Sequence, residues 1–481
     1  MGGALVVAAF AFLVAALSFT WGAALAGLCL CLLLVGYATQ RGKANFAAAL
    51  LMFFMLYFGV VPYLQLLTNS TMYLDPIDPN GSAVVLWYLL VFSFLAVFWA
   101  SLRVYDFKLH TQLLSRPRSS ELTYAYLALC AAAYLFFFAK FGSVGAMFEL
   151  YDQRVTEGVG DFNPLKGLGV VQAFANAFPL ILFVLLVARI KRPSLGKFLL
   201  LTLLTLALGF VVSAAFGSRQ GVVFLAWGCF WIWHRTVNNF SRKFIVNSVL
   251  VSALLMLIMM PLKFFGTSFT FDMISEFNEI RGIDAFGGPL GFALFRDFGR
   301  FDIQVELAGK MLAGEVDYGY GKTLLGGLLS PVPNAIFDAS KLSPTLLKTM
   351  VLYGAGWYNQ DYTTLLSGLP GEFLMNYSYV GYMLFGLLLA TLVFLLRIIN
   401  LRTQAKSGLV YFEVFLLPLV FLIFLFDTNV IGYYLFRWVV VFSVPMYLLS
   451  RNAAVAGAVS ARVVTHGGSQ PAVTADRIRH E

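Results

Sequence analysis

The sequence predicts an all-α polytopic integral membrane protein with about 12 transmembrane helices and one large, partly helical periplasmic loop. Of its 481 residues, 60% are apolar and only 12% are charged, whereas roughly a quarter are charged in soluble proteins. The mean hydropathy is +0.81. Apolar runs near the roughly 20 residues that cross a bilayer recur along the chain, and lysine and arginine gather in alternate connections between them.

The apolar runs give the expected spans in chain order. The first run has no basic segment before it, so it is expected to stay as a span and not to be cleaved as a signal peptide. The run at 220–234 is short, and only three residues separate the first two runs. The expected spans are 3–19, 21–38, 45–67, 83–102, 121–139, 167–188, 196–216, 220–234, 244–264, 371–396, 408–426 and 428–450.

The placement of basic residues predicts the orientation. With both termini in the cytoplasm, every cytoplasmic connection carries at least two lysines or arginines, while the short outer loop 67–81 carries Asp75 and Asp78 and no basic residue. The chain therefore divides into a membrane domain (1–264, spans 1–9), a large periplasmic loop (265–370), a second membrane domain (371–450, spans 10–12) and a cytoplasmic tail (451–481) that is expected to be disordered.

The long polar loop contains two stretches with helical spacing, at 271–280 and 292–312. Between and after them, 314–327 is rich in glycine and 330–344 in proline, which favours irregular structure. The second helical stretch places Arg296 and Arg300 four residues apart, hence on one face.

Several kinds of chemistry are excluded or disfavoured. The cysteines all fall in apolar runs and predict neither disulfides nor zinc binding. The four histidines, His110, His234, His466 and His480, fall on the cytoplasmic side. An outward-facing site would then need a carboxylate as its base and arginine for a bound anion. No nucleotide-binding or metal-binding motif is present, so no cofactor and no metal is expected. The net charge of +9 reflects cytoplasmic loops and not a nucleic-acid partner.

Five arginines are candidate anion ligands. Arg219 lies in the turn Gly217-Ser218-Arg219, where a guanidinium beside a helix N-terminus suits a lipid-linked phosphate; the alternative is an anchor at the lipid boundary. Arg296 and Arg300 could clamp a diphosphate, with Arg281 as a third cation. The alternative is local pairing with the acids of the same helix, which are Asp297, Asp302 and Glu306.

The fifth arginine and two acids lie near the last spans. Arg437 lies inside a span, where an ionisable residue is a functional candidate by default; alternatively it neutralises Asp427 or another carboxylate. Glu372 precedes a long apolar helix and is either an acid in its first turn or a base facing the loop. Asp361 is the rival carboxylate.

Four aromatic residues of the loop could stack on sugar rings: Trp357, Tyr358, Tyr318 and Tyr320. Aromatic residues are also common at membrane boundaries, so the alternative is a purely interfacial role.

With these features the chain resembles the Wzy-type O-antigen or oligosaccharide repeat-unit polymerases. The resemblance depends on the Gly217-Ser218-Arg219 turn, the large late loop and the run 371–382 (GEFLMNYSYVGY). It implies a metal-independent glycosyltransferase of the GT-C type in the bacterial inner membrane, acting in lipopolysaccharide or exopolysaccharide assembly. The growing glycan would move from undecaprenyl diphosphate to a lipid-linked repeat unit at the periplasmic face, with a chain-length regulator and a flippase as further candidate partners.

The resemblance also implies roles for the candidates. Arg219, Arg296 and Arg300 would neutralise the diphosphate leaving group, and Glu372 by preference, or Asp361, would activate the acceptor hydroxyl. The related O-antigen ligases usually use a loop histidine, which this sequence lacks outside, so a polymerase is favoured. A ligase or another lipid-linked-sugar transferase stays open.

Two readings from other classes remain. A transporter also often has twelve spans, but carriers often show internal repeats and polar sites at the membrane midplane, and neither is evident in the sequence. A non-catalytic scaffold for envelope assembly would predict that no single outer arginine matters.

Overall fold

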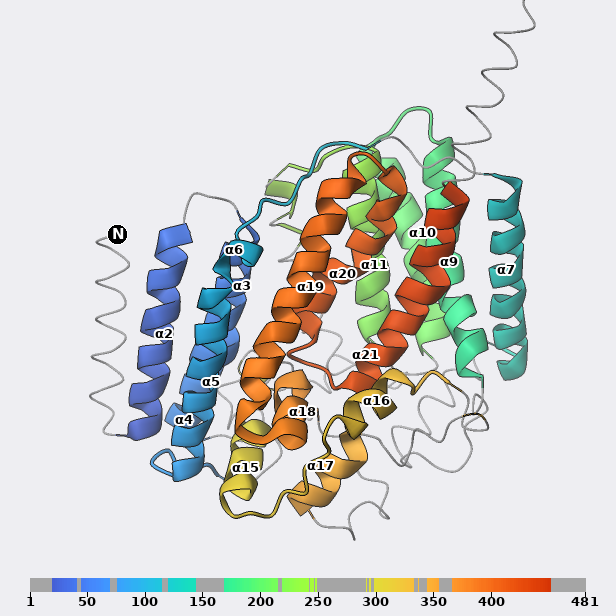
Figure 1. Cartoon of the computed structure of the whole chain (residues 1–481). Helices are drawn as coiled ribbons and strands as arrows, with labels where there is room; N and C mark the ends of the chain where they lie inside the picture. Colours follow the sequence, from blue (N-terminus) through green and yellow to red (C-terminus); the bar gives the residue numbers. More distant parts are fainter. Residues whose placement is uncertain are drawn as a thin grey trace, which may run out of the picture.

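The computed structural model is a bundle of roughly parallel and antiparallel helices with several short helices at one end (Figure 1). It describes residues 20–40, 45–69, 76–114, 120–143, 168–214, 219–241, 243–245, 247–248, 291, 294–295, 298–332, 336, 344–353 and 366–450. Within these ranges every regular element is helical and there is no strand. This confirms the predicted all-α class for the part of the chain that can be seen.

The described helices follow one another in this order. The first part of the chain forms α2 (Trp21–Gln40), α3 (Phe46–Phe54), the π-helical turn η1 (Met55–Val60), α4 (Val61–Thr68), α5 (Ser82–Ala100), α6 (Leu102–Tyr105), α7 (Glu121–Phe141), α9 (Gly169–Arg189), α10 (Leu195–Ala214) and α11 (Arg219–Thr236). The second part forms α15 (Phe301–Leu312), α16 (Lys322–Leu328), α17 (Pro344–Tyr353), α18 (Gly368–Tyr377), η6 (Ser378–Val380), α19 (Gly381–Thr403), η7 (Ser407–Leu409), α20 (Val410–Leu422), α21 (Thr428–Tyr434) and the π-helical η8 (Leu435–Ser443).

Eight helical segments of the described residues are long and apolar enough to cross a membrane. They extend over Trp21–Gln40, Phe46–Thr68, Ser82–Ala100, Glu121–Lys140, Gly169–Arg189, Leu195–Val212, Gly368–Thr403 and Thr428–Ser450. The chain is therefore a polytopic membrane protein. The expected spans 3–19 and most of 244–264 lie outside the described residues, so the count of about twelve stays a prediction.

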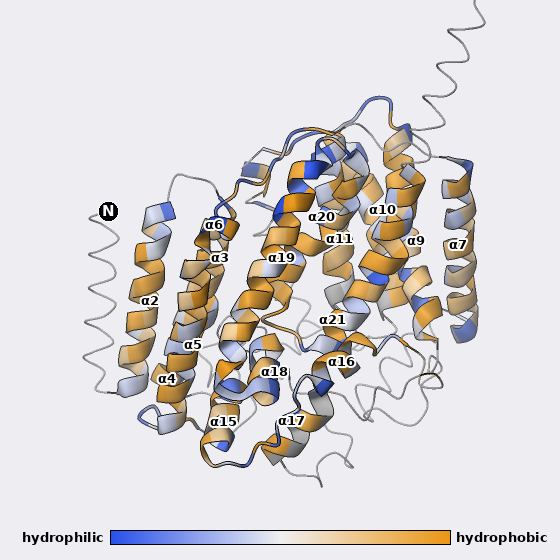
Figure 2. Cartoon of the chain, in the orientation of Figure 1, coloured by the Kyte–Doolittle hydropathy of each residue, from blue (hydrophilic) through white to orange (hydrophobic). Residues whose placement is uncertain are grey.

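The basic connections lie together at one end of the bundle, as the charge pattern predicts. Arg397 at the end of α19 donates to the backbone of Arg103 (3.0 Å), and Arg235 at the end of α11 donates to the backbone of Gln112 (2.6 Å). We call this the basic end; it is hydrophilic at the top of Figure 2. The opposite end, which carries α15, α16, α17 and α18, we call the loop-helix end (Figure 1).

Local sequence explains where several helices begin and end. The Asn45 side chain accepts from the amide of Ala48 (3.1 Å) and caps α3. Ser120 and Thr123 form a reciprocal capping box at the start of α7. That helix ends at Gly142, whose φ of 74° glycine adopts without a Cβ clash.

Proline shapes α20 in a specific way. Pro418 has no N–H, so the carbonyl four residues earlier, that of Val414, loses its helical partner. The indole of Trp227 in α11 donates to this carbonyl at 2.6 Å. The lost hydrogen bond is thereby replaced by one that ties α20 to α11.

The centre of the bundle is packed with aromatic rings around Phe424, which is fully buried. Its ring centroid lies 5.0 Å from that of Phe385, 5.4 Å from Phe54 and 6.0 Å from Phe94. Offset and edge-to-face contacts of this kind stabilise beyond simple area burial. Phe424 thus fixes the residues that follow α20 against α3, α5 and α19.

The structure differs from the expected elements in three details. The span expected at 371–396 lies within the apolar segment Gly368–Thr403, but the short η6 separates this segment into α18 and α19. The span expected at 408–426 ends as a helix at Leu422. The helix expected over 292–312 is interrupted at Arg300, which adopts a non-helical conformation before α15 begins. The four cysteines lie in α2, α7 and α11 as thiols.

Replacing Phe424 by alanine tests the aromatic centre. We expect Phe424→Ala to lower the free energy of unfolding by about 3 to 5 kcal/mol, because a large buried ring is lost and a cavity remains. The matched control is Phe394→Ala, since Phe394 of α19 is 48% exposed. Thermal unfolding in detergent should show a large shift for the first variant and little for the second. Equal shifts would contradict the central role of Phe424.

Candidate functional site

The most unusual feature of the described bundle is a break between α20 and α21, which we call the break segment (residues 423–427). Non-helical backbone at membrane depth is tolerated only where protein groups satisfy its hydrogen bonds. Three successive carbonyls of the break segment accept from donors distant in sequence: Ile423 from the amide of Leu369 (2.9 Å), Phe424 from the Tyr57 hydroxyl (2.9 Å) and Leu425 from Nε of Arg300 (3.2 Å). The break is therefore a supported part of the fold.

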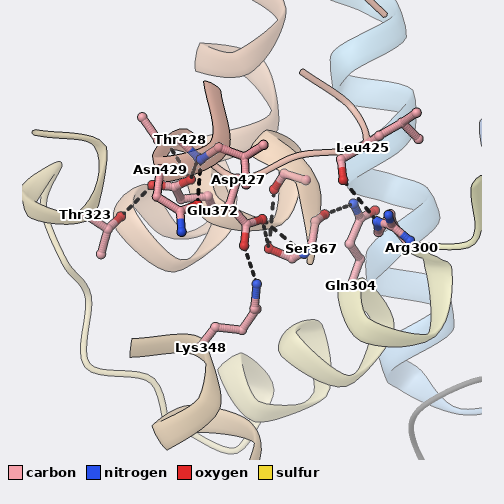
Figure 3. Close-up of polar contacts among 12 residues, drawn as sticks. Arg300, Gln304, Thr323, Lys348, Ser367, Glu372, Leu425, Asp427, Thr428 and Asn429 are labelled. Carbon is pink, nitrogen blue, oxygen red and sulfur yellow. Dashed lines mark hydrogen bonds and ion pairs between the residues drawn. The ribbon is translucent and has the colours of Figure 1, made fainter. Parts of the chain in front are cut away.

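Glu372 caps the helix that follows the break. Its Oε2 accepts from the backbone amide of Thr428 (2.8 Å) and from the Thr428 hydroxyl (2.6 Å), and its Oε1 accepts from the Thr323 hydroxyl (2.9 Å). Figure 3 shows this carboxylate between α16 and α21. A negative group at a helix N-terminus is stabilised by the free amides and the helix dipole. Glu372 thus supplies the cap that the side chain of the N-cap residue Asp427 does not provide.

The Glu372 side chain is fully buried and contacts the loop tract through Thr323, so its expected role as an acid or base facing the loop stays a prediction. Glu372 does not lie in the first turn of the long apolar helix. It belongs to α18, a separate ten-residue helix. The sequence run suggested one continuous helix, whereas η6 separates α18 from α19.

Asp427 lies at the end of the break segment and is bound to the loop helices. It forms an ion pair with Lys348 of α17 and accepts from the amide (3.1 Å) and hydroxyl (3.2 Å) of Ser367. Both charged side chains are almost completely buried. The alternative that Arg437 neutralises Asp427 is therefore wrong. The acid holds α17 and the start of α18 against the break (Figure 3).

Gln304 of α15 joins four elements through a fully used side-chain amide. Its oxygen accepts from the Trp87 indole (3.0 Å) and the Tyr382 hydroxyl (2.8 Å), and its nitrogen donates to the Tyr57 hydroxyl (3.0 Å) and the Ser367 carbonyl (2.7 Å). A glutamine amide can make four such bonds. Gln304 is completely buried, so its polar atoms need protein partners. Because all four hydrogen bonds of its side-chain amide are made, α15 can pack into the bundle.

Arg300 supports the break segment from the start of α15. It is only 6% exposed and donates to the carbonyls of Leu425 and Gly299, the latter at 2.8 Å. Arg300 has a non-helical backbone conformation, and Arg296 lies outside the described residues, so their position on one helix face stays a prediction. Figure 3 shows its guanidinium turned toward the break.

The other expected site residues are only partly visible. Tyr318 and Tyr320 lie near each other, with ring centroids 6.4 Å apart; Tyr320 is 77% exposed, whereas the Tyr318 hydroxyl accepts from Ser378 at 3.1 Å. Arg219 is the first residue of α11, and its side chain is outside the description. The remaining candidates lie outside the described residues: Arg281, Arg296, Trp357, Tyr358 and Asp361.

Arg437 lies in η8, within the last span, and is half-buried. The ion pairs found among the described residues use Arg235, Lys310 and Lys348 instead. Arg437 is therefore left without an acidic partner in the described part of the chain.

The site residues that sequence reasoning missed are Gln304, Lys348 and Ser367. Lys348 and Ser367 lie in the polar loop tract, where a single lysine or serine does not stand out from its neighbours in the sequence. Asp427 was considered only as a partner for arginine, although a single acid between two apolar runs is itself a signal of a buried functional or structural group. Within the described residues, no group of three or more potential ligands could hold a metal ion.

No protein-family model, curated protein or solved structure matches the chain. The chemistry of the site must therefore be judged from its own residues. The described network is closed and satisfied, so it can position helices and cap a helix end.

A double-mutant cycle tests the Asp427 ion pair. We expect Lys348→Met to lower the free energy of unfolding by about 3 to 5 kcal/mol, because it leaves a buried carboxylate without its partner. Adding Asp427→Leu to that variant should restore most of the loss, since the uncompensated charge is gone. Lys322→Met is the control, because Lys322 is exposed in α16. Equal losses for the single and double variants in chemical unfolding would contradict the pairing.

Proposed function

We propose that the chain is an integral membrane glycosyltransferase that polymerises lipid-linked oligosaccharide repeat units, as the O-antigen polymerases do. The observation that best supports this function is the concentration of polar groups at one end of an apolar bundle. There the short helices α15 to α18 are fixed to the connection between α20 and α21 by buried hydrogen bonds and an ion pair. A lipid-linked sugar diphosphate presents its reacting carbon at such a membrane boundary.

The proposed reaction needs few protein groups. The acceptor hydroxyl oxygen attacks the anomeric carbon of the donor glycan, the bond from that carbon to the diphosphate oxygen breaks, and undecaprenyl diphosphate leaves with the bonding electrons. The proton of the hydroxyl passes to a carboxylate. Fixed cations that meet the developing charge on the diphosphate would supply most of the acceleration, and a positioned base adds about 10² to 10⁴.

The contacts of Glu372 and Arg300 change the roles that we propose for the candidate residues. Glu372 and Arg300 are engaged in capping α21 and supporting the break segment, so we propose them as positioning residues. Asp361 then becomes the preferred base. Arg219, Arg281 and Arg296 remain the proposed diphosphate ligands, and Trp357, Tyr358 and the exposed Tyr320 the proposed sugar contacts.

The direct test is to incubate the purified protein with a synthetic undecaprenyl-diphosphate repeat unit and to separate the products by size. A ladder of products is expected. A single added unit would indicate a monosaccharide transferase, and transfer only to a lipid core added as a second acceptor would indicate a ligase. The absence of any product would contradict the proposal.

Two variants test the proposed chemistry. Arg219→Ala should slow polymerisation by about 10²-fold or more if the guanidinium meets the leaving group. Asp361→Asn should do the same if the carboxylate accepts the proton. Arg402→Ala is the control, because Arg402 is exposed at the basic end. Normal rates for the two test variants, at unchanged melting temperature, would remove these residues from the mechanism.

Two substitutions of Glu372 distinguish a role as general base from a role in capping α21. Glu372→Gln keeps an acceptor for Thr428, so we expect polymerisation within about tenfold of the unaltered protein, less than the loss of a general base. Glu372→Ala removes the cap and should cost about 2 to 4 kcal/mol of stability. A folded Glu372→Gln protein that polymerises a thousandfold more slowly would return the base role to Glu372.

A transporter is the second candidate, because one observation favours it. Secondary carriers bind substrates and ions near the membrane midplane, where non-helical backbone and helix ends face the ligand. The connection 423–427 between the antiparallel helices α20 and α21 is such non-helical backbone, packed in the centre of the bundle with a carboxylate at the N-terminus of α21. Uptake of a labelled solute into proteoliposomes, with no polymer formed from the lipid-linked repeat unit, would favour this reading.

A further inference from the structure

Arg437 is a charged residue of the last span that the buried network leaves out. It lies in η8, one turn beyond α21, in a segment that crosses the membrane. No described residue forms an ion pair with it or accepts a hydrogen bond from its guanidinium. An unpaired ionisable side chain inside a span is costly, so its presence calls for a binding partner from outside the described fold.

The position of Arg437 on its helix indicates where that partner comes from. The exposed residues of the last span recur at helical spacing on one face: Tyr433 (44% exposed), Val440 (52%), Val444 (37%) and Leu448 (49%). Arg437 lies between Tyr433 and Val440 and is itself half-buried, so its side chain starts beside this stripe. In a membrane this stripe faces lipid, and its apolar members exclude a water-soluble anion from that side.

Arg437 follows Tyr433 by four residues, about one helical turn. Because side chains of a helix lean toward its N-terminus, the Arg437 side chain is expected to lean toward Tyr433 and the loop-helix end. Tyr433 in turn packs on the first residue of α9: a Cβ placed on Gly169 would lie 3.6 Å from its ring and 3.8 Å from its hydroxyl. Arg437 and Tyr433 therefore flank the start of α9.

The start of α9 offers further donors. Leu168, its N-cap, provides no side-chain hydrogen bond, and the first turn contains no acidic residue. No described residue accepts from the amides of Gly169, Val170 or Val171. The free amides of this 21-residue helix and its dipole favour an anion at this point.

We propose that Arg437, Tyr433 and the first turn of α9 form a lateral docking site for the phosphate of a membrane-embedded lipid. The guanidinium supplies charge-assisted hydrogen bonds, the hydroxyl and amides complete the donor set, and the acyl or prenyl chain lies along the exposed stripe of the last span. If the bound lipid is the lipid-diphosphate carrier, the site rests on the proposed function. If the bound lipid is an anionic phospholipid, the site is independent of the proposed function.

Native mass spectrometry of the full-length protein tests this site. The detergent-solubilised protein is mixed in turn with undecaprenyl diphosphate, phosphatidic acid and phosphatidylcholine, and the lipid-bound fraction is measured. We expect the two lipids with an exposed phosphate to be retained in preference to phosphatidylcholine. Arg437→Gln should weaken that retention by about tenfold or more, since charge-assisted hydrogen bonds are lost.

Two variants control the measurement. Arg437→Lys keeps the charge but not the planar fork, so its retention should be intermediate. Arg402→Gln removes an exposed arginine at the basic end and should retain lipid like the unaltered protein. If Arg437→Gln does not fold, crosslinking of the unaltered protein with a photoreactive phosphatidic acid replaces it. Labels on 428–450 or the first turns of α9 would support the site, and labels only elsewhere would overturn it.

The outcomes separate the source of the lipid from the existence of the site. Arg437-dependent preference for undecaprenyl diphosphate identifies the carrier, and equal Arg437-dependent retention of phosphatidic acid identifies a bilayer phospholipid; both support the site. Retention of all three lipids alike, or an Arg437→Gln protein that binds like the unaltered one, would overturn it. Because binding is measured without turnover, a protein that binds through Arg437 but makes no polymer contradicts only the proposed function.

Discussion

The loop-helix end depends on one physical constraint, the need to satisfy the non-helical backbone between α20 and α21. Carbonyls that leave a helix inside a membrane find no water to bond with, so protein donors must be brought to them. Here the donors come from η1, from the residue before α15 and from α18. Each of these elements is thereby fixed in position, and residues far apart in the sequence must meet at the break.

Buried charges at both ends of the bundle serve the same purpose. Asp427 and Lys348 tie α17 to the break, and at the basic end Glu413 pairs with Arg235 (3.1 Å) and accepts from Asn400 (2.7 Å). A buried ion pair contributes little net stability compared with apolar packing, but removing one partner is strongly destabilising. These pairs therefore specify which helices lie together more than they stabilise the bundle.

The division between satisfied and available groups bears on function. Glu372, Arg300 and Gln304 make hydrogen bonds to other parts of the fold, so they hold the loop helices in place. Arg437 is the contrasting case, a half-buried cation of the last span that forms no ion pair within the described residues. Under the proposed function, a closed polar network would keep the loop helices rigid while an open cation meets the lipid.

The sequence by itself determined the all-α membrane class, most span boundaries and the gathering of basic residues at one end, because these depend on composition and on local hydrophobic periodicity. It could not determine that Glu372 is buried, that Arg300 interrupts a helix or that Asp427 pairs with Lys348. Only the tertiary structure decided these, because the break at 423–427 draws its partners from remote segments. A charge in a polar tract looks solvent-exposed until the fold shows which backbone group requires it.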